Sequence, residues 1–258
     1  MTLDTCRATD RLSPVPQKPL PGRGDGRAAV SRGGAACGTV RGMAEEAIDL
    51  PGLPSPVRLA VCVSGGGTTL QNLIHSVRSG ELAAEVVRVI ASGPSCGAIG
   101  RASAAGIDCT VLKASDFPDA AAYGEAVFAD CEAAGADLVL LAGFLKRVGV
   151  PDAWRYRVLN IHPSLIPAFC GEGFYGRRVH EAALARGVKV SGCTVHFVDD
   201  QYDHGPVVMQ RCVPVLSDDT PERLAARVFE QECQVYPEAV RLVASGRLSV
   251  VGRRVVER

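Results

Sequence analysis

The hydrophobic positions between residues 58 and 162 alternate between two periods. Short apolar runs predict buried strands at 58–63, 86–91, 109–112 and 137–142, and a fifth strand ends at 162. Helical spacing between these runs predicts helices at 68–78, 98–105 and 120–134. Strands that alternate with helices favour a parallel sheet with right-handed crossovers.

The pattern changes after residue 162. It predicts a helix at 179–186 and β-rich runs at 190–198 and 207–215. Thr220 as N-cap and Pro221 at the first helical position open a last helix that runs to about 244, and a small hairpin closes the chain. The fold class we predict is therefore α/β, an open, mostly parallel, Rossmann-like sheet with helices on both faces.

The first 56 residues differ in composition from the rest of the chain. They hold 7 Pro and 8 Gly and no Phe, Trp or Tyr, so they bury too little apolar area to offset the entropy of ordering. We therefore predict a disordered extension at 1–56 and one folded domain at 57–258. Met43 is a candidate internal start, and a targeting peptide or a functional arm are the other interpretations of this extension.

Composition excludes several classes of partner. Lys plus Arg and Asp plus Glu both number 28, and this balance argues against a nucleic-acid binder or a membrane-surface protein. The longest apolar run, 138–145, is far shorter than the roughly 20 residues of a membrane span. Ten cysteines include no C-x-x-C pair, which favours reduced thiols and a cytoplasmic location over a zinc site.

A glycine-rich loop joins the first predicted strand to the first helix. Its residues are Ser64, Gly65, Gly66, Gly67, Thr68 and Thr69. Unpaired N–H groups and the partial positive charge of a helix N-terminus suit a phosphate there, and glycine permits close approach. The loop has neither the lysine of a P-loop nor the last glycine of G-x-G-x-x-G, so a tight structural turn is the alternative.

Two polar clusters follow later strands. Strand alternation places Asn160 and His162 on one side at a carboxyl end of the sheet, where open α/β folds bind ligands. Residues 196–206 offer three carboxylates and two imidazoles before a Gly-Pro turn. An amide can stabilise an oxyanion and an imidazole can move a proton near neutral pH. A structural histidine and a solvated acidic turn are the alternatives, and the spacing does not favour a metal site.

Together these segments resemble the phosphoribosylglycinamide formyltransferase family. The resemblance runs from about 58 to 248 and rests on 63–71, 141–148, 160–169, 188–199 and 203–206, in this order. It implies a formyltransferase fold, and transfer of a formyl group from 10-formyltetrahydrofolate, as co-substrate, to the amine of glycinamide ribonucleotide. It further implies small-molecule partners and needs no metal. With the composition, we expect no nucleic-acid or membrane partner, and we expect a monomer or homodimer.

The resemblance also implies roles for particular residues. The catalytic trio would be Asn160, His162 and Asp203. Phosphate and ribonucleotide contacts would come from Gly65, Gly66, Gly67, Thr68, Thr69 and Glu232. Folate contacts would come from Leu145, Lys146, Arg147, Val148, Val198 and Asp199, together with Asn160.

Several positions depart from the family pattern. Gly66 and the residues after it replace the usual asparagine-containing loop, and His204 stands where Thr or Gly is commoner. An arginine that meets the folate tail in some members aligns with Ala120, and Lys146 or Arg147 could substitute for it. The alternatives are a formyltetrahydrofolate deformylase, a methionyl-tRNA formyltransferase and a nonenzymatic nucleotide-binding module on the same fold.

Overall fold

The computed structural model describes residues 46–258. The first half contains β1 (Ala47–Asp49), β2 (Val57–Val63), α1 (Thr68–Arg78), β3 (Ala84–Ala91), α2 (Ala98–Ala105), β4 (Cys109–Val111), α3 (Ala120–Ala133) and β5 (Leu138–Leu141). The second half contains β6 (Val158–His162), α4 (Arg177–Arg186), β7 (Val190–Phe197), β8 (Val207–Pro214), α5 (Pro221–Ala244), β9 (Leu248–Val251) and β10 (Arg254–Glu257). Short 3-10 turns lie at Ala114–Asp116 and Asp152–Trp154.

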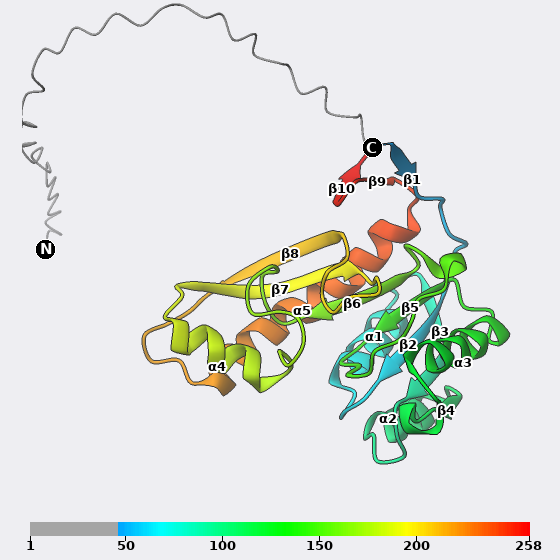
Figure 1. Cartoon of the computed structure of the whole chain (residues 1–258), viewed down its shortest axis with the longest axis horizontal. Helices are drawn as coiled ribbons and strands as arrows, with labels where there is room; N and C mark the ends of the chain where they lie inside the picture. The colour runs from blue at the N-terminus through cyan, green and yellow to red at the C-terminus, as the bar shows by residue number, and fades with distance from the viewer. Residues whose placement is uncertain (1–45) are drawn as a thin grey trace, which may run out of the picture. The chain divides into compact units, whose positions relative to one another are not determined.

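The ten strands within residues 46–258 form one sheet in the order β1-β9-β10-β8-β7-β6-β5-β2-β3-β4 (Figure 1). Strands β2 to β6 run parallel to one another, as the alternation of strands and helices predicts. β7 is antiparallel to β6, and β8 is antiparallel to β7. The predicted open α/β sheet is confirmed, although its second half is mixed rather than parallel.

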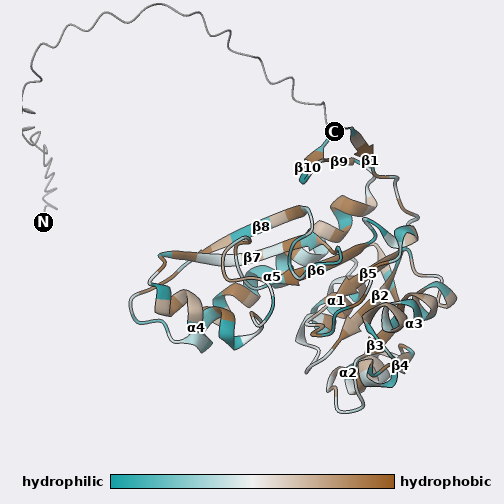
Figure 2. Cartoon of the chain, viewed as in Figure 1, coloured by the Kyte–Doolittle hydropathy of each residue, from teal (hydrophilic) through white to brown (hydrophobic). Residues whose placement is uncertain are grey.

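The two faces of the sheet bury two separate hydrophobic clusters. In β2, Leu59, Val61 and Val63 pack with α1, α2 and α5, whereas Ala60 and Cys62 pack with α3 on the opposite face. This alternation follows from the two-residue period of a strand. Figure 2 shows that β2, β3 and β5 carry mostly hydrophobic residues, as expected for strands covered on both faces. Helices on both faces are therefore confirmed.

A buried tyrosine of α5 fixes the centre of the sheet. The Tyr236 hydroxyl donates to one of two backbone carbonyls, that of Leu141 at 3.1 Å and that of Leu159 at 3.0 Å. The Leu141 carbonyl belongs to the last residue of β5, and the Leu159 carbonyl lies in the neighbouring parallel strand β6. The long last helix thus holds in place the sheet edge from which the loops with the candidate functional residues emerge.

The predicted domain boundary at residue 56 lies too late. β1 pairs with β9 in an antiparallel ladder, and Leu50 is 6% exposed, with its N–H bonded to the Leu248 carbonyl. The pairing partner lies about 200 residues away, so composition alone gives no sign that 47–53 are ordered. The predicted disorder of 1–45, like the candidate start at Met43, lies outside the described residues.

Within residues 46–258, none of the helices combines the length and the apolar character needed to cross a membrane.

Candidate active site

Three segments bring their polar side chains to the same point. β6 ends with Asn160 and His162, two residues apart and on the same side of the strand. The antiparallel register sets Asn160 opposite His196 of β7. The loop that follows β7 carries Asp203, whose side chain is only 10% exposed. These residues are separated by up to 43 positions, and the sheet register is what brings them together.

The predicted trio converges within hydrogen-bonding range. The Asn160 Nδ2 lies 3.4 Å from Asp203 Oδ1, and His162 Nδ1 lies 3.4 Å from Asp203 Oδ2. Asn160 Nδ2 also lies 3.1 Å from the Nε2 of His196. An amide, two imidazoles and one carboxylate therefore form a single buried cluster.

The backbone contacts of the two imidazoles assign their tautomers. His196 Nδ1 lies 2.7 Å from the Phe197 carbonyl and must carry a proton, so its Nε2 accepts from Asn160. The same reasoning assigns a proton to His162 Nε2, 2.9 Å from the Phe169 carbonyl. The Nδ1 of a neutral His162 is then an acceptor that faces Asp203, ready to take up a proton beside a carboxylate.

Burial and neighbouring charges shift the pKa values of His162 and Asp203 in opposite directions. Burial lowers the pKa of His162 despite the opposing effects of Asp203 and the Phe169 carbonyl. Burial pushes the pKa of Asp203 up, but the His196 and His162 imidazoles and the Gly171 N–H outweigh it and lower this pKa. Near neutral pH, the cluster therefore pairs an ionised carboxylate with a neutral imidazole.

The loop between β6 and α4 closes over the cluster. The Gly171 N–H donates to Asp203 Oδ2 at 2.8 Å, and the Phe169 carbonyl holds His162. Phe169 and Asp203 both have a φ of 52°, a left-handed conformation that is unusual for a residue with a side chain. Backbone strain of this kind gathers at functional sites.

The glycine-rich loop presents backbone rather than side chains. Gly67 is the N-cap of α1 with a φ of 76°, and no side chain caps the helix. A Cβ at Gly67 would lie 2.7 Å from the Cβ of Ala98, so only glycine fits against α2. The N–H groups at the start of α1 are left without a side-chain cap, in an arrangement that binds anions.

Three adjoining cavities link this helix start to the polar cluster. The loop cavity, about 70 Å³, is lined among others by Arg147, Val148, Val198 and Asp199. The central cavity, about 510 Å³, reaches Leu145 and His162. The helix cavity, about 380 Å³, is lined by Thr68, Thr69 and Glu232. Asn160, Asp203 and Lys146 line both the loop and central cavities, and Gly143, Ile161 and Pro163 line both the central and helix cavities.

Most predicted site residues thus line one continuous hollow, but the glycines of the loop do not. Gly65, Gly66 and Gly67 shape the turn, and the Gly66 carbonyl accepts from Arg101 at 2.8 Å. Thr68 and Thr69 are the members of the predicted phosphate set that face the helix cavity. Among residues 46–258 there is also no cluster of three or more His, Cys, Asp or Glu placed to hold a metal ion.

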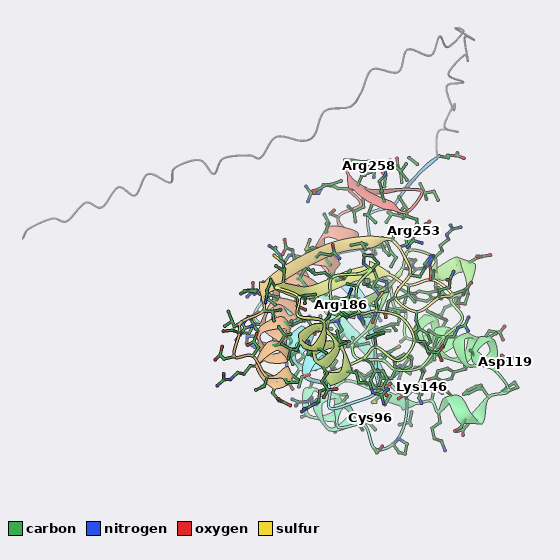
Figure 3. The ribbon with its side chains drawn as sticks, turned by 60° about the vertical axis from the view of Figure 1, so that its left-hand side comes forward. Cys96, Asp119, Lys146, Arg186, Arg253 and Arg258 are labelled. Carbon is green, nitrogen blue, oxygen red and sulfur yellow. The ribbon has the colours of Figure 1, made fainter. Side chains whose placement is uncertain are left out.

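Sequence reasoning assigned no role to the residues that hold this site in position. The pairing of Asn160 with His196 could have been found from strand alternation across the two runs that carry them. The contacts of Phe169 with His162 and of Gly171 with Asp203 could not be predicted from the local sequence, because they depend on the path of the loop after Pro163. Lys146, which is labelled in Figure 3, lines both the loop and the central cavity. Arg147 instead donates a hydrogen bond to the Asp200 carbonyl at 2.9 Å.

The open α/β sheet thus carries an amide–imidazole–carboxylate cluster close to a helix N-terminus that no side chain caps. A family model described as formyl transferase matches residues 57–240. The chain belongs to the formyl transferase family.

Known relatives agree with this family. A phosphoribosylglycinamide formyltransferase, chloroplastic, from Vigna unguiculata is 41% identical over 74% of this chain, which spans 62% of that relative's length. A trifunctional purine biosynthetic protein adenosine-3 from Bos taurus is 40% identical over 78% of this chain and 20% of its own length. The solved glycinamide ribonucleotide transformylase 1 from Symbiobacterium toebii has a TM-score of 0.73 and 42% identity, with 78% of this chain and 93% of that chain covered.

Proposed function

We propose that this protein transfers the formyl group of 10-formyltetrahydrofolate to the amine of 5'-phosphoribosylglycinamide. The products are formylglycinamide ribonucleotide and tetrahydrofolate, a step of de novo purine (IMP) biosynthesis. The observation that carries the proposal is the continuous hollow, with an anion-binding helix start at one end and the Asn160, His162 and Asp203 cluster at the other. The names of the similar proteins support the same reaction.

The helix cavity suits a phosphoribosyl group. Thr68 and Thr69 supply N–H groups at a helix N-terminus, which favour a phosphate. Glu232 lines the same cavity, and burial raises its pKa to about 7. A carboxyl group in that position gains from the hydroxyl groups of a ribose, because each hydroxyl can donate a hydrogen bond to it.

The loop and central cavities suit the folate donor. Their shared wall holds Phe144, Lys146 and Tyr202, so an aromatic ring system finds apolar contacts next to a cation. Lys146, rather than Arg147, takes the place of the arginine missing at position 120, because Arg147 already binds the Asp200 carbonyl. The negative glutamate tail of the donor would pair with the Lys146 ammonium group.

The chemistry we propose is direct attack of the substrate amine on the formyl carbon. The amine nitrogen forms the new C–N bond, and the bond from that carbon to N10 of the folate breaks as the tetrahedral intermediate collapses. The amide N–H of Asn160 is only loosely held by Asp203, at 3.4 Å, and can turn to the developing oxyanion. His162 Nδ1 accepts the amine proton beside Asp203 and passes it to the departing N10.

One assay tests this function against its rivals. Consumption of 10-formyltetrahydrofolate is measured with and without glycinamide ribonucleotide, and we expect it only when both are present. Consumption without an acceptor would indicate the deformylase, and formylation of methionyl-tRNA the tRNA enzyme. No consumption under any condition would leave the nonenzymatic binding module.

Two further expectations remain predictions. The sequence favours a cytoplasmic location, although the relative from Vigna unguiculata is named chloroplastic. We also expect a monomer or homodimer, which sedimentation of the purified protein can decide.

A further inference from the structure

A buried imidazole that lines the helix cavity has one ring nitrogen without a hydrogen-bond partner among residues 46–258. His180 of α4 is 4% exposed and lines the cavity together with Thr68, Thr69 and Glu232. Its Nδ1 is fully buried and unpaired among residues 46–258. More than nine in ten buried polar groups of proteins have a partner, so a buried imidazole that lines a cavity and keeps one ring nitrogen unpaired points to a ligand that the ring contacts when the cavity is filled.

The other unpaired buried atoms do not share this position. Arg88 Nε and Asp130 Oδ2 face each other at 3.4 Å as an ion pair on the sheet side of α3. Ser191 Oγ lies in β7, away from the three connected cavities. Of the four, only His180 lines the hollow in which we place the substrates.

The charge state of His180 indicates which kind of ligand group it can bind. Burial lowers its pKa, and the nearby His162 lowers it further, so the ring is neutral near pH 7. A neutral imidazole donates through one nitrogen and accepts through the other. This suits an uncharged group that both donates and accepts, such as a hydroxyl or an amide, better than a phosphate, which only accepts.

We propose that His180 is a binding residue for the ribonucleotide and hydrogen-bonds the uncharged part of it between the phosphate and the reacting amine. This inference rests on the proposed function and extends it. The phosphate is already served by the start of α1, and the reacting amine must reach His162 in the adjoining cavity. The remaining polar groups are the ribose hydroxyls and the amide of the glycinamide.

The proposal predicts opposite effects of one substitution on the free and the bound protein. His180→Leu removes an unpaired polar group from the interior, so the unliganded protein should melt at the same or a higher temperature. The same change removes a hydrogen bond to the ribonucleotide. We expect the KM of the ribonucleotide to rise roughly 10-fold, with kcat and the KM of the folate donor little changed. The rise in Tm on adding ribonucleotide should shrink in parallel.

Ser191→Ala is the matched control. It also removes an unpaired buried polar atom, but outside the hollow. Its melting temperature without ligand should stay the same or rise, and its response to the ribonucleotide should stay as in the wild type. His180→Asn and His180→Gln place an amide near the two ring-nitrogen positions, and one of them should restore part of the ribonucleotide response. If His180→Leu does not fold, His180→Ala takes its place in the comparison.

Two ligands separate the possible contacts. If His180→Leu weakens the Tm response to ribose 5-phosphate as well, the contact is a ribose hydroxyl. If it weakens only the response to glycinamide ribonucleotide, the contact is the amide. If the Tm of His180→Leu rises on adding the ribonucleotide as much as that of the wild type, this inference is wrong but the proposed function is not affected. A wild-type protein that does not respond to the ribonucleotide at all would instead overturn the proposed function.

Discussion

The two ends of the hollow are built from different parts of the chain. At the helix cavity, the groups that we propose bind the phosphate are backbone N–H groups of α1, positioned by the turn at Gly67. At the polar cluster, the groups that we propose take part in the reaction are the side chains of Asn160 and His162 from β6 and of Asp203 from the loop after β7. The comparison suggests that phosphate binding at the first end depends on backbone geometry, whereas proton transfer at the second end depends on single atoms of side chains.

The largest effect we expect is at the polar cluster. Asp203→Asn keeps the shape of the side chain but removes the charge that faces His162 Nδ1 at 3.4 Å. His162→Ala removes the imidazole that we propose transfers the proton. Each should lower kcat by about 10²–10⁴, typical of lost acid–base catalysis, with little effect on the ribonucleotide KM. Steady-state kinetics with both substrates measures the split, and near-normal turnover in either variant would remove that residue from the mechanism.

The second prediction concerns the backbone of the helix end. Gly67→Ala would place a Cβ 2.7 Å from that of Ala98 at a φ of 76°. We expect it to lower the free energy of unfolding by about 2–4 kcal/mol and to raise the ribonucleotide KM more than it lowers kcat. Gly80→Ala is the control, since Gly80 has a φ of 78° but nothing within 4 Å of the added Cβ. Equal losses of stability in the two variants would contradict the role of the contact with α2.

The third prediction concerns Glu232, one of the two carboxyl groups that line the helix cavity. Burial raises the pKa of Glu232 from 4.5 to about 7 in the folded protein. The folded state therefore holds a proton that the unfolded chain has already lost between these pH values, and the stability of the wild type falls as pH rises through them. Glu232→Gln has no such group, so its stability relative to the wild type should increase by about 2 kcal/mol from pH 5 to pH 8.

Urea unfolding of both proteins at the two pH values measures this difference. Other titrating groups cancel because they are common to both proteins. A constant difference in stability across this range would show that Glu232 ionises normally. The substitution should also raise the ribonucleotide KM, which separates a role in binding from a purely electrostatic cost of burial.

The sequence predicted the parallel half of the fold closely. Helix α1 was expected at 68–78 and begins and ends there, because its apolar spacing and its flanking glycines are local signals. The convergence of Asn160, His162 and Asp203 was also expected, since a strand end and its neighbouring loop share one edge of the sheet. Local sequence patterns are enough to predict the position of a residue that lies at the end of a regular strand or in the loop next to it.

Other contacts depend on segments that meet only in three dimensions. The β1 strand was assigned to the disordered extension, because its partner β9 lies at the other end of the chain. The unpaired Nδ1 of His180 reflects an enclosed surface that no spacing reveals. His204, a departure from the family pattern, bonds Asp199 at 2.7 Å and Arg253 of the C-terminal hairpin at 2.6 Å.

The smallest effect we predict concerns this last contact. Arg253, labelled in Figure 3, lies in the turn between β9 and β10 and binds both the ring and the carbonyl of His204. It thereby ties the C-terminal hairpin to the loop that carries Asp203. The His204 side chain is 41% exposed, so its contact with Arg253 contributes only about 0.5–1 kcal/mol.

Arg253→Ala should therefore raise the KM of the folate donor roughly 2- to 5-fold, because Asp199 forms part of the loop cavity, and should leave the ribonucleotide KM unchanged. Arg254→Ala removes the same charge from the next residue, which pairs through its strand with Val207 and Val251, and serves as the control. Equal donor KM values for the two variants would mean that the hairpin charge acts at long range. A rise in the donor KM in Arg253→Ala alone would show that the C-terminal hairpin helps to position the loop that carries Asp199 and Asp203.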